Sequence, residues 1–281
     1  RELQAMGEDD RCHVLVKGFR TDGGFYPVKE KAHKIEFIGD SITSGEGTYG
    51  ATEDTEWLTM YMSSSRHYGN LIGKALDADI HIISQGGWGV LTGWDNNPNC
   101  NIPSVYEKVC GLAAGDFNAA LGAKQEYDFK WQPDVVIINL GTNDNSAFHQ
   151  PAWMDPVSGI SYKQELTETG EFEEKSRERL EQAVIAFLKT IRKHNPDSFL
   201  LWCYGMLGYD LNIPLISAVD RYRKESGDTN VAFINLPDTL QKDYGSHMHP
   251  GYACHEIAAG VLIDYLTKKF GWEEKTRRGN L

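Results

Sequence analysis

The stretch "KIEFIGDSITSGEG", residues 34–47, decides the fold and raises the functional question. Its start is rich in apolar, β-favouring side chains, and that run ends at Gly39, Asp40 and Ser41. A serine directly after a strand most often caps a helix. It can also be a nucleophile, provided that other groups at the same place activate it. The rest of the chain has to decide between these two roles.

Composition limits the function classes. The chain has 281 residues, of which 41% are hydrophobic and 24% charged, enough for one large core or for one core with a small appendage. The net charge of −12 argues against nucleic acid and anionic lipid as main partners. No apolar run reaches the roughly 18 residues that cross a bilayer. We therefore expect no nucleic-acid or membrane partner; the oligomeric state stays open.

The terminus and the cysteines say little about location. The opening residues "RELQAMGEDDR" are polar and charged, unlike a signal peptide, and the chain starts without Met, as a mature or trimmed product would. Export is therefore neither shown nor excluded. The five cysteines form no C-x-x-C, which argues against a zinc-ribbon or thioredoxin-like protein. We expect Cys203 and Cys254 to be buried thiols, whereas Cys100 and Cys110 would pair only in a secreted protein.

Strand-like and helix-like segments alternate along most of the chain. Five nearly continuous apolar runs predict strands covered on both faces: 34–38, 80–84, 134–140, 198–205 and 230–236. Four segments have helical spacing: 63–78, 173–195, 214–226 and 250–270. This alternation predicts an α/β fold with right-handed crossovers, in which helices cover both faces of a five-stranded parallel sheet.

Two regions fall outside that pattern. Residues 1–33 look like a strand and a turn with no helix to complete a crossover, so we expect a short N-terminal β appendage, or the end of a β domain, ahead of a catalytic domain at 34–281. Residues 91–132 are rich in Asn, Gly and aromatic residues. Connections of that length are usually functional or mobile.

Reactive and hydrogen-bonding groups follow several of the predicted strands. In an open parallel sheet, ligands bind at the carboxyl ends of the strands. Those ends are followed by Gly39-Asp40-Ser41, by "QGGWGV" (85–90), by "GTND" (141–144) and, before the last helix, by "SHMHPG" (246–251). Each piece alone is weak, because glycines finish turns and Asn or His often caps a helix. Together they bring a hydroxyl, backbone donors, an amide and an imidazole to one sheet edge.

That set of groups suits acyl transfer. Ser41 needs a base to remove its proton, and His249 can do so at neutral pH. The tetrahedral intermediate carries a negative charge on the former carbonyl oxygen, which donors fixed in advance stabilise. The N–H groups of Ser41 and of one glycine, with the Asn143 amide, would form such an oxyanion hole.

The blocks "GDSIT", "GTND" and "HMHPG", with the looser "GGWGV", resemble those of the SGNH (GDSL-type) hydrolases over residues 35–270. The resemblance implies a flavodoxin-like three-layer α/β/α fold. Within this superfamily the sequence is most similar to carbohydrate esterase family 2, whose members remove acetyl groups from xylan and related polysaccharides. The family also carries a β-sandwich ahead of the hydrolase, which "HVLVKGFR" (13–20) resembles.

The resemblance implies an acetylated polysaccharide or small ester as substrate and favours a secreted or cell-surface location, with a cytoplasmic one left open. We place the oxyanion glycine at Gly89, because the first glycines should finish the turn out of the strand; Gly87 is the rival. Trp88 and Trp94 are candidates to stack on sugar rings.

The sequence departs from the superfamily at the third catalytic position. Most members have an Asp two or three residues before the His, where this chain has His247 and Ser246. Either Asp243 reaches in or a backbone carbonyl orients His249, with His247 as a further candidate. We expect a Ser–His dyad.

Several alternatives are weighed against the esterase. His247, His249 and His255 suggest a metal site, but no aspartate-rich cluster accompanies them, so we expect no metal and no cofactor. The G-x-S-x-G and G-x-G-x-x-G motifs are missing. The loops are polar, which favours a small acyl group over a lipid. A lipase, lysophospholipase or thioesterase, and a non-catalytic carbohydrate-binding relative, remain as alternatives.

Overall fold

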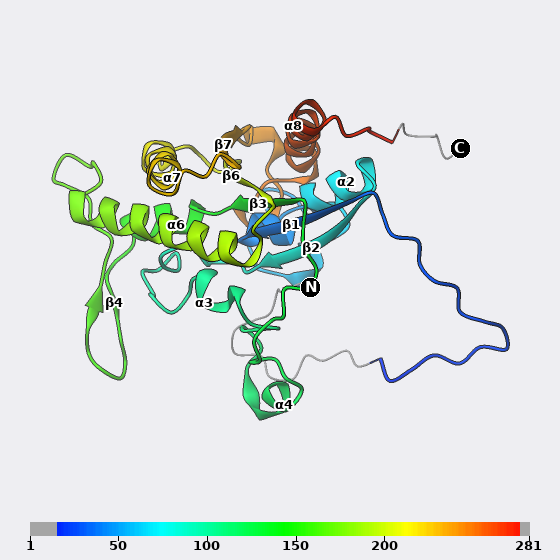
Figure 1. Cartoon of the computed structure of the whole chain (residues 1–281). Helices are drawn as coiled ribbons and strands as arrows, with labels where there is room; N and C mark the ends of the chain where they lie inside the picture. The colour runs from blue at the N-terminus through cyan, green and yellow to red at the C-terminus, as the bar shows by residue number, and fades with distance from the viewer. Residues whose placement is uncertain (1–15, 276–281) are drawn as a thin grey trace.

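The computed structural model describes residues 16–275, and from residue 33 onward the chain forms a three-layer α/β/α unit around one parallel sheet (Figure 1). The sheet order is β2-β1-β3-β6-β7. The strands are β1 (His33–Gly39), β2 (Ala78–Ser84), β3 (Val135–Asn139), β6 (Phe199–Gly205) and β7 (Val231–Leu236). All five predicted strands and their parallel pairing are confirmed.

Helices cover both faces of the sheet, as predicted (Figure 1). Helices α2 (Tyr68–Ala75) and α8 (Tyr252–Phe270) pack on one face, and α6 (Glu174–His194) and α7 (Asn212–Ser226) on the other. Each pair closes its own apolar core against the sheet. Because the central strands β1, β3 and β6 are covered on both faces, their side chains are buried along nearly their whole length, whereas the edge strands β2 and β7 are partly exposed.

The strand order places the future site. The chain runs from β1 outward to β2 and then returns to the other side of β1 for β3. Gly39 at the end of β1 pairs with Ser84 of β2 and with Asn139 of β3. The segments that follow these strands therefore start side by side, at the point where the strand order reverses and where ligands of such sheets bind.

Shorter elements fill the connections. They are α1 (Ser41–Ser44), η1 (Thr59–Tyr61), α3 (Pro103–Tyr106), α4 (Gly115–Ala120), α5 (Thr142–His149), the hairpin β4 (Trp153–Met154) with β5 (Ser161–Tyr162), η2 (Gln241–Asp243) and η3 (Ser246–Met248). The connection predicted at 91–132 contains two of these helices. Its Ile102 and Tyr106 are fully buried in the core, so much of this region is packed structure.

The described residues ahead of β1 are not part of the sheet. Residues 16–32 carry no strand and leave the body as an extended arm (Figure 1), with Phe25, Tyr26 and Val28 largely exposed. The strand expected in residues 13–20 lies partly outside the described residues. The division into an appendage and a catalytic domain at residue 34 therefore stays a prediction.

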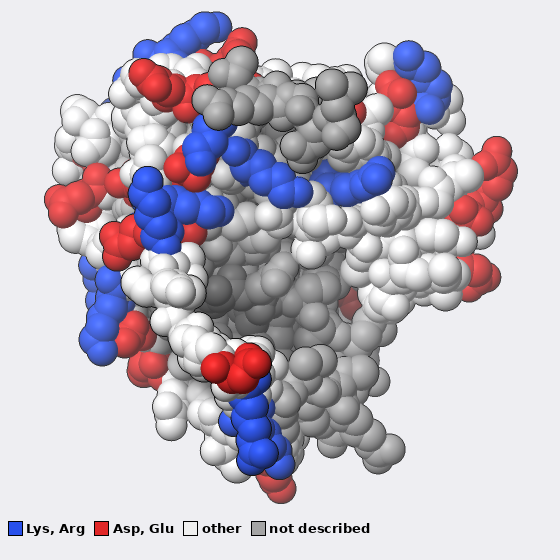
Figure 2. Space-filling view, turned by 90° about the vertical axis from the view of Figure 1, so that its right-hand side faces the viewer, with Lys and Arg blue, Asp and Glu red and all other residues white. Residues whose placement is uncertain are grey.

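The four described cysteines all carry free thiols. Cys203 and Cys254 are buried, as predicted, and Cys100 and Cys110 are free thiols. Within residues 16–275, no helix is long and apolar enough to cross a membrane. On the face in Figure 2, Lys and Arg side chains lie intermixed with Asp and Glu.

Candidate active site

The turn after β1 presents Ser41. Asp40 is the N-cap of α1, and its carboxylate accepts a hydrogen bond from the Ile42 N–H at 3.0 Å. Since Asp40 does the capping, the Ser41 hydroxyl is not needed for it. Gly39 is required before this turn, because a side chain there would overlap the Thr43 hydroxyl. The interpretation of Ser41 as a helix cap, the commonest role of a serine after a strand, is therefore wrong.

His249 meets Ser41 from the loop before α8. Its Nε2 lies 2.8 Å from Ser41 Oγ, and its Nδ1 donates to the His247 carbonyl at 2.7 Å. The loop itself is held by the Gly245 N–H, which donates to the His249 carbonyl, and by the Gly251 N–H, which donates to the Asp243 carbonyl. With the Nδ1 proton held on a carbonyl, Nε2 is the bare nitrogen that faces the serine hydroxyl.

The surroundings keep this imidazole neutral. Burial lowers the pKa of His249 below its ordinary value, and the Glu46 carboxylate opposes that effect. A neutral imidazole at pH 7 can accept the proton of Ser41. The pair thus has the geometry and the protonation state of a nucleophile and its base.

The structure decides between the two groups expected to orient His249. The His247 backbone carbonyl occupies Nδ1, and among the described residues Glu46, not Asp243, is the carboxylate that forms an ion-pair contact with His249. Asp243 as the orienting acid is therefore wrong. His247 takes part through its carbonyl, and its ring stacks parallel to that of His249 with centroids 5.4 Å apart.

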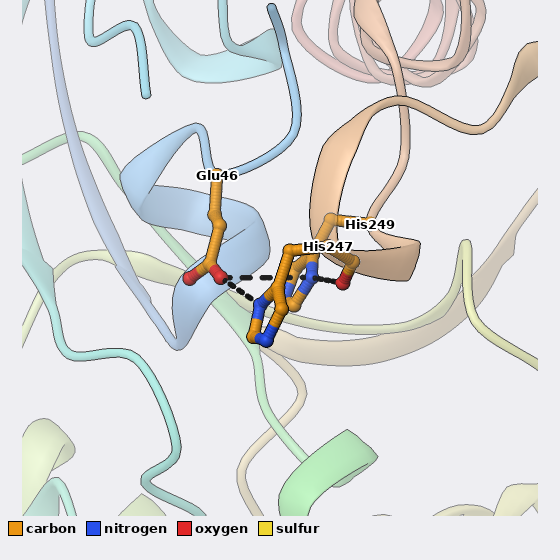
Figure 3. A group of neighbouring side chains, drawn as sticks. All are labelled: Glu46, His247 and His249. Carbon is orange, nitrogen blue, oxygen red and sulfur yellow. Dashed lines mark hydrogen bonds and ion pairs between the residues drawn. The ribbon is translucent and has the colours of Figure 1, made fainter. Parts of the chain in front are cut away.

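Glu46 is a site residue that the sequence analysis missed. It follows α1 directly, is almost fully buried, and accepts a hydrogen bond from His247 Nδ1 at 2.7 Å (Figure 3). The same carboxylate oxygen lies 3.7 Å from His249 Nδ1. The sequence signal that could have found Glu46 is an acid between two glycines in the loop after Ser41. Its contact with the histidines, however, is visible only in the folded structure.

Asn143 and Asp144 act on two sides of α5. The Asn143 side chain lines the pocket, its nitrogen 3.1 Å from the Trp88 carbonyl and 3.3 Å from Asp40. Asp144 points the other way and accepts the N–H groups of Val90 and Leu91, both at 2.8 Å. Burial raises the pKa of Asp40 to about 7 and that of Asp144 to about 6.

The oxyanion glycine is corrected by the structure. The Gly89 N–H donates to the Thr92 carbonyl at 2.9 Å, so it is already engaged, and Gly89 does not line the pocket. Gly87 does line it, with a left-handed φ of 76°. Among the described residues the Gly87 N–H has no acceptor. The placement at Gly89 is therefore wrong, and the geometry favours Gly87.

Gly89 has a structural role that can be tested. A Cβ there would lie 2.5 Å from the Asp144 carboxyl carbon, and that carboxylate is anchored by backbone N–H groups. We expect Gly89→Ala to lower the free energy of unfolding by about 2–3 kcal/mol through overpacking. Urea unfolding measures this. Gly260→Ala is the control, because open space surrounds Gly260 on α8; equal stability of both variants would refute the steric role.

The groups above open into one pocket of about 560 Å³, a volume typical of small-molecule sites. Trp94 lies on the pocket wall and is half-exposed, so its role in sugar contact stays a prediction, whereas Trp88 packs against the main core. The pocket is lined by Ser41, Glu46, Trp57, Gln85, Gly86, Gly87, Trp94, Asn143, Ser146, Gln150, His247 and His249.

The trio Glu46, His247 and His249 also meets a loose criterion for a metal site, with one ligand atom of each within 4.8 Å of the others. In the structure these atoms are directed at protein partners: His247 Nδ1 at Glu46, His249 Nδ1 at a carbonyl and His249 Nε2 at Ser41. A tetrahedral zinc site needs its ligand lone pairs turned to one common centre. The arrangement as it stands does not fit that requirement.

The chain is similar to known acylhydrolases and esterases. The family model of the GDSL-like lipase/acylhydrolases matches residues 35–268. An acetylxylan esterase / glucomannan deacetylase of Cellvibrio japonicus is 33% identical over 281 residues, which cover 96% of this chain and 69% of that protein. The cellulase/esterase CelE of Acetivibrio thermocellus is 27% identical, but the chain spans only 26% of it.

Among solved structures, an acetyl xylan esterase, Est2A, from the rumen bacterium Butyrivibrio proteoclasticus is 51% identical with a TM-score of 0.87, covering 89% of this chain and 67% of that one. A family two carbohydrate esterase from Clostridium thermocellum, in complex with cellohexaose, is 25% identical with a TM-score of 0.70, covering 88% and 67%. The chain therefore belongs to the GDSL-like lipase/acylhydrolase family and resembles the family 2 carbohydrate esterases within it.

Proposed function

We propose that this protein is a serine esterase that removes small acyl groups, acetyl foremost, from the hydroxyls of a polysaccharide or oligosaccharide. The 2.8 Å contact between Ser41 Oγ and His249 Nε2 inside the pocket carries this proposal. A buried nucleophile–base pair with donors beside it has no purpose in a pure binding site.

The first half of the reaction forms an acyl-enzyme. His249 Nε2 takes the proton of the Ser41 hydroxyl as Oγ attacks the ester carbonyl. The oxyanion that forms faces the N–H groups of Ser41 and Gly87 and the Asn143 amide. The Ser41 N–H is available because the first residue of a helix has no partner in the helix's own ladder. The carbonyl re-forms, and the sugar hydroxyl leaves with the proton from His249.

The second half releases the acid. A water enters, His249 removes one of its protons, and the resulting hydroxide attacks the acyl-serine carbonyl. The same donors stabilise the second oxyanion. When this intermediate breaks down, Ser41 Oγ recovers its proton from His249 and acetic acid leaves, which gives its remaining proton to water and becomes acetate. The chain is then ready for another turnover, with no cofactor in the scheme.

The pocket supports a polar alcohol and a small acyl group. Amide side chains, Gln85 and Gln150, line it together with Trp57 and Trp94, the combination of flat rings and hydrogen-bonding groups that suits sugars. The relatives named as acetylxylan esterases and glucomannan deacetylases support the same substrate class. A lipase would need a broad apolar approach to the serine, for which this lining gives no support.

Acetate release tests the proposal. Acetylated xylan, acetylated glucomannan, 4-nitrophenyl acetate and 4-nitrophenyl octanoate are compared at equal enzyme concentration. We expect hydrolysis of the acetyl substrates and at least a tenfold preference for 4-nitrophenyl acetate over the octanoate. A preference for the octanoate would favour the lipase alternative. Binding of the glycans without acetate release would favour the non-catalytic relative.

A further inference from the structure

We propose that Glu46, delivered by the nucleophile loop, supplies the negative charge that in related hydrolases comes from an acid beside the base, and that it positions His249 for catalysis. The inference rests on the proposed esterase function. It assigns to Glu46 a positioning role, since its carboxylate contacts His247 and lies 3.7 Å from His249 Nδ1.

The covalent path from Ser41 to Glu46 is short and fixed. The Glu46 N–H donates to the Ser41 carbonyl at 3.0 Å, which ties the acid to the nucleophile's own turn. Glycines at 45 and 47 both adopt left-handed φ values, 83° and 77°. A side chain at position 47 would lie 2.5 Å from the His249 Cβ. The loop is thus shaped to bring its acid against the histidine loop.

The carboxylate is held where it can act on the base. His247 Nδ1 donates to one Glu46 oxygen at 2.7 Å, and the same oxygen is 3.7 Å from His249 Nδ1 (Figure 3). His247 adopts an unusual left-handed φ of 53°, which a residue other than glycine rarely takes without a reason. With this backbone, the same residue offers its carbonyl to His249 and its ring to Glu46.

Among the described groups around His249, Glu46 is the one that supplies a negative charge to the imidazole. On α8 behind it, burial lowers the pKa of His255 to about 3, so that ring is neutral in the working range. Ser41 is uncharged, and the His247 ring, whose positive charge when protonated opposes a second charge on His249, stacks on it with centroids 5.4 Å apart. Within residues 16–275, Glu46 is the carboxylate that forms an ion-pair contact with His249. An anion under 4 Å from the imidazole favours its charged form.

This geometry makes the role useful at one point of the reaction. When Ser41 attacks, His249 becomes an imidazolium, and the buried carboxylate beside Nδ1 stabilises that charge while the His247 carbonyl keeps the proton on Nδ1. The carbonyl alone fixes the tautomer but brings no full charge. Glu46 therefore supplies what a dyad with only a backbone carbonyl lacks.

The test compares Glu46→Gln, Glu46→Asp and the control Glu53→Gln on 4-nitrophenyl acetate across pH 4 to 9. Glu53 is exposed and lies outside the pocket. We expect Glu46→Gln to lower kcat about tenfold to hundredfold with little change in KM, and to move the acid limb of kcat/KM to lower pH by about one unit. The limb moves down because loss of an anion lowers the pKa of the neighbouring imidazole.

Three comparisons make the outcome decisive. Glu46→Asp, which keeps the charge, should recover part of both effects, and Glu53→Gln should match wild type. If the kcat/KM profile of Glu46→Gln is lower at all pH values but its acid limb lies at the wild-type pH, Glu46 has only a structural role and the proposal is overturned. Activity that EDTA abolishes and Zn²⁺ restores would also overturn it, since the trio would then be a metal site. If Glu46→Gln fails to fold, Glu46→Asp takes its place, because the shorter side chain moves the carboxylate away from His249. An acid limb of kcat/KM at the wild-type pH in that variant would overturn the proposal.

Failure of this inference is separable from failure of the esterase proposal. If Ser41→Ala is inactive while Glu46→Gln keeps the wild-type rate and pH profile, the esterase stands and only the role of Glu46 falls. If the wild-type protein releases no acetate from any ester, the esterase proposal itself falls.

Discussion

Ser41→Ala is expected to lower kcat/KM for 4-nitrophenyl acetate by about a thousandfold or more, the scale seen when a nucleophile of this kind is removed. The reason is chemical: without Oγ no acyl-enzyme forms, and the remaining donors can only assist direct attack by water. Folding should be little affected, since Asp40 rather than Ser41 caps α1.

The measurement pairs initial rates with thermal unfolding. Ser64→Ala is the matched control, because Ser64 is an exposed serine outside the pocket. A Tm within about 2 °C of wild type, together with the lost rate, would assign the loss to chemistry. If Ser41→Ala kept the wild-type rate, the nucleophile assignment would be wrong. If wild type were as inactive as the variant, glycan binding would become the hypothesis to pursue.

Asn143→Ala is expected to give the second-largest effect, a fall in kcat of about a hundredfold to a thousandfold, comparable to the loss of one oxyanion donor elsewhere. The amide is already held by the Trp88 carbonyl and Asp40 at the pocket wall. The contact with Asp40 is the longer of the two at 3.3 Å, so that N–H is the one that turns to the oxyanion when the negative charge develops. Because that charge exists only in the intermediate and the states flanking it, KM should change much less than kcat.

The control for this variant comes from the same helix. Asn145 lies two residues along α5, does not line the pocket and contacts Asp210. Asn145→Ala should stay within a few-fold of wild-type activity. Equal losses in the two variants would point to damage of α5 as a whole, and a rise in KM with constant kcat for Asn143→Ala would mean that the amide binds the ground state instead.

Local pattern was enough to predict the fold of the sheet domain. Continuous apolar runs and helical spacing are properties of neighbouring residues, and parallel strands covered on both faces leave that mark directly in the sequence. Ser41, Asn143 and His249 could be found for a related reason. Each follows a predicted strand or precedes the last helix, and the ends of parallel strands meet at one edge.

The errors share one cause, which is competition for hydrogen bonds. Gly89 and Gly87 are both glycines after β2, and nothing local tells which N–H is free. The turn back to Thr92 consumes the Gly89 N–H, and Asp144 occupies the space that a side chain at position 89 would need. The spacing also made Asp243 a candidate, but the His247 carbonyl accepts the His249 Nδ1 proton, which leaves no hydrogen bond at that nitrogen for the Asp243 carboxylate.

By itself the sequence determined the α/β architecture and the family, and it pointed to Ser41, Asn143 and His249 as candidate nucleophile, amide donor and base, because these depend on local pattern and on motifs. Only the tertiary structure decided which backbone amide faces the pocket, which carbonyl holds His249 and that Glu46 lies against the histidines. Glu46 and His247 are about 200 residues apart in the chain. Their contact is a product of packing between two loops, and packing is a property that no local pattern of residues records.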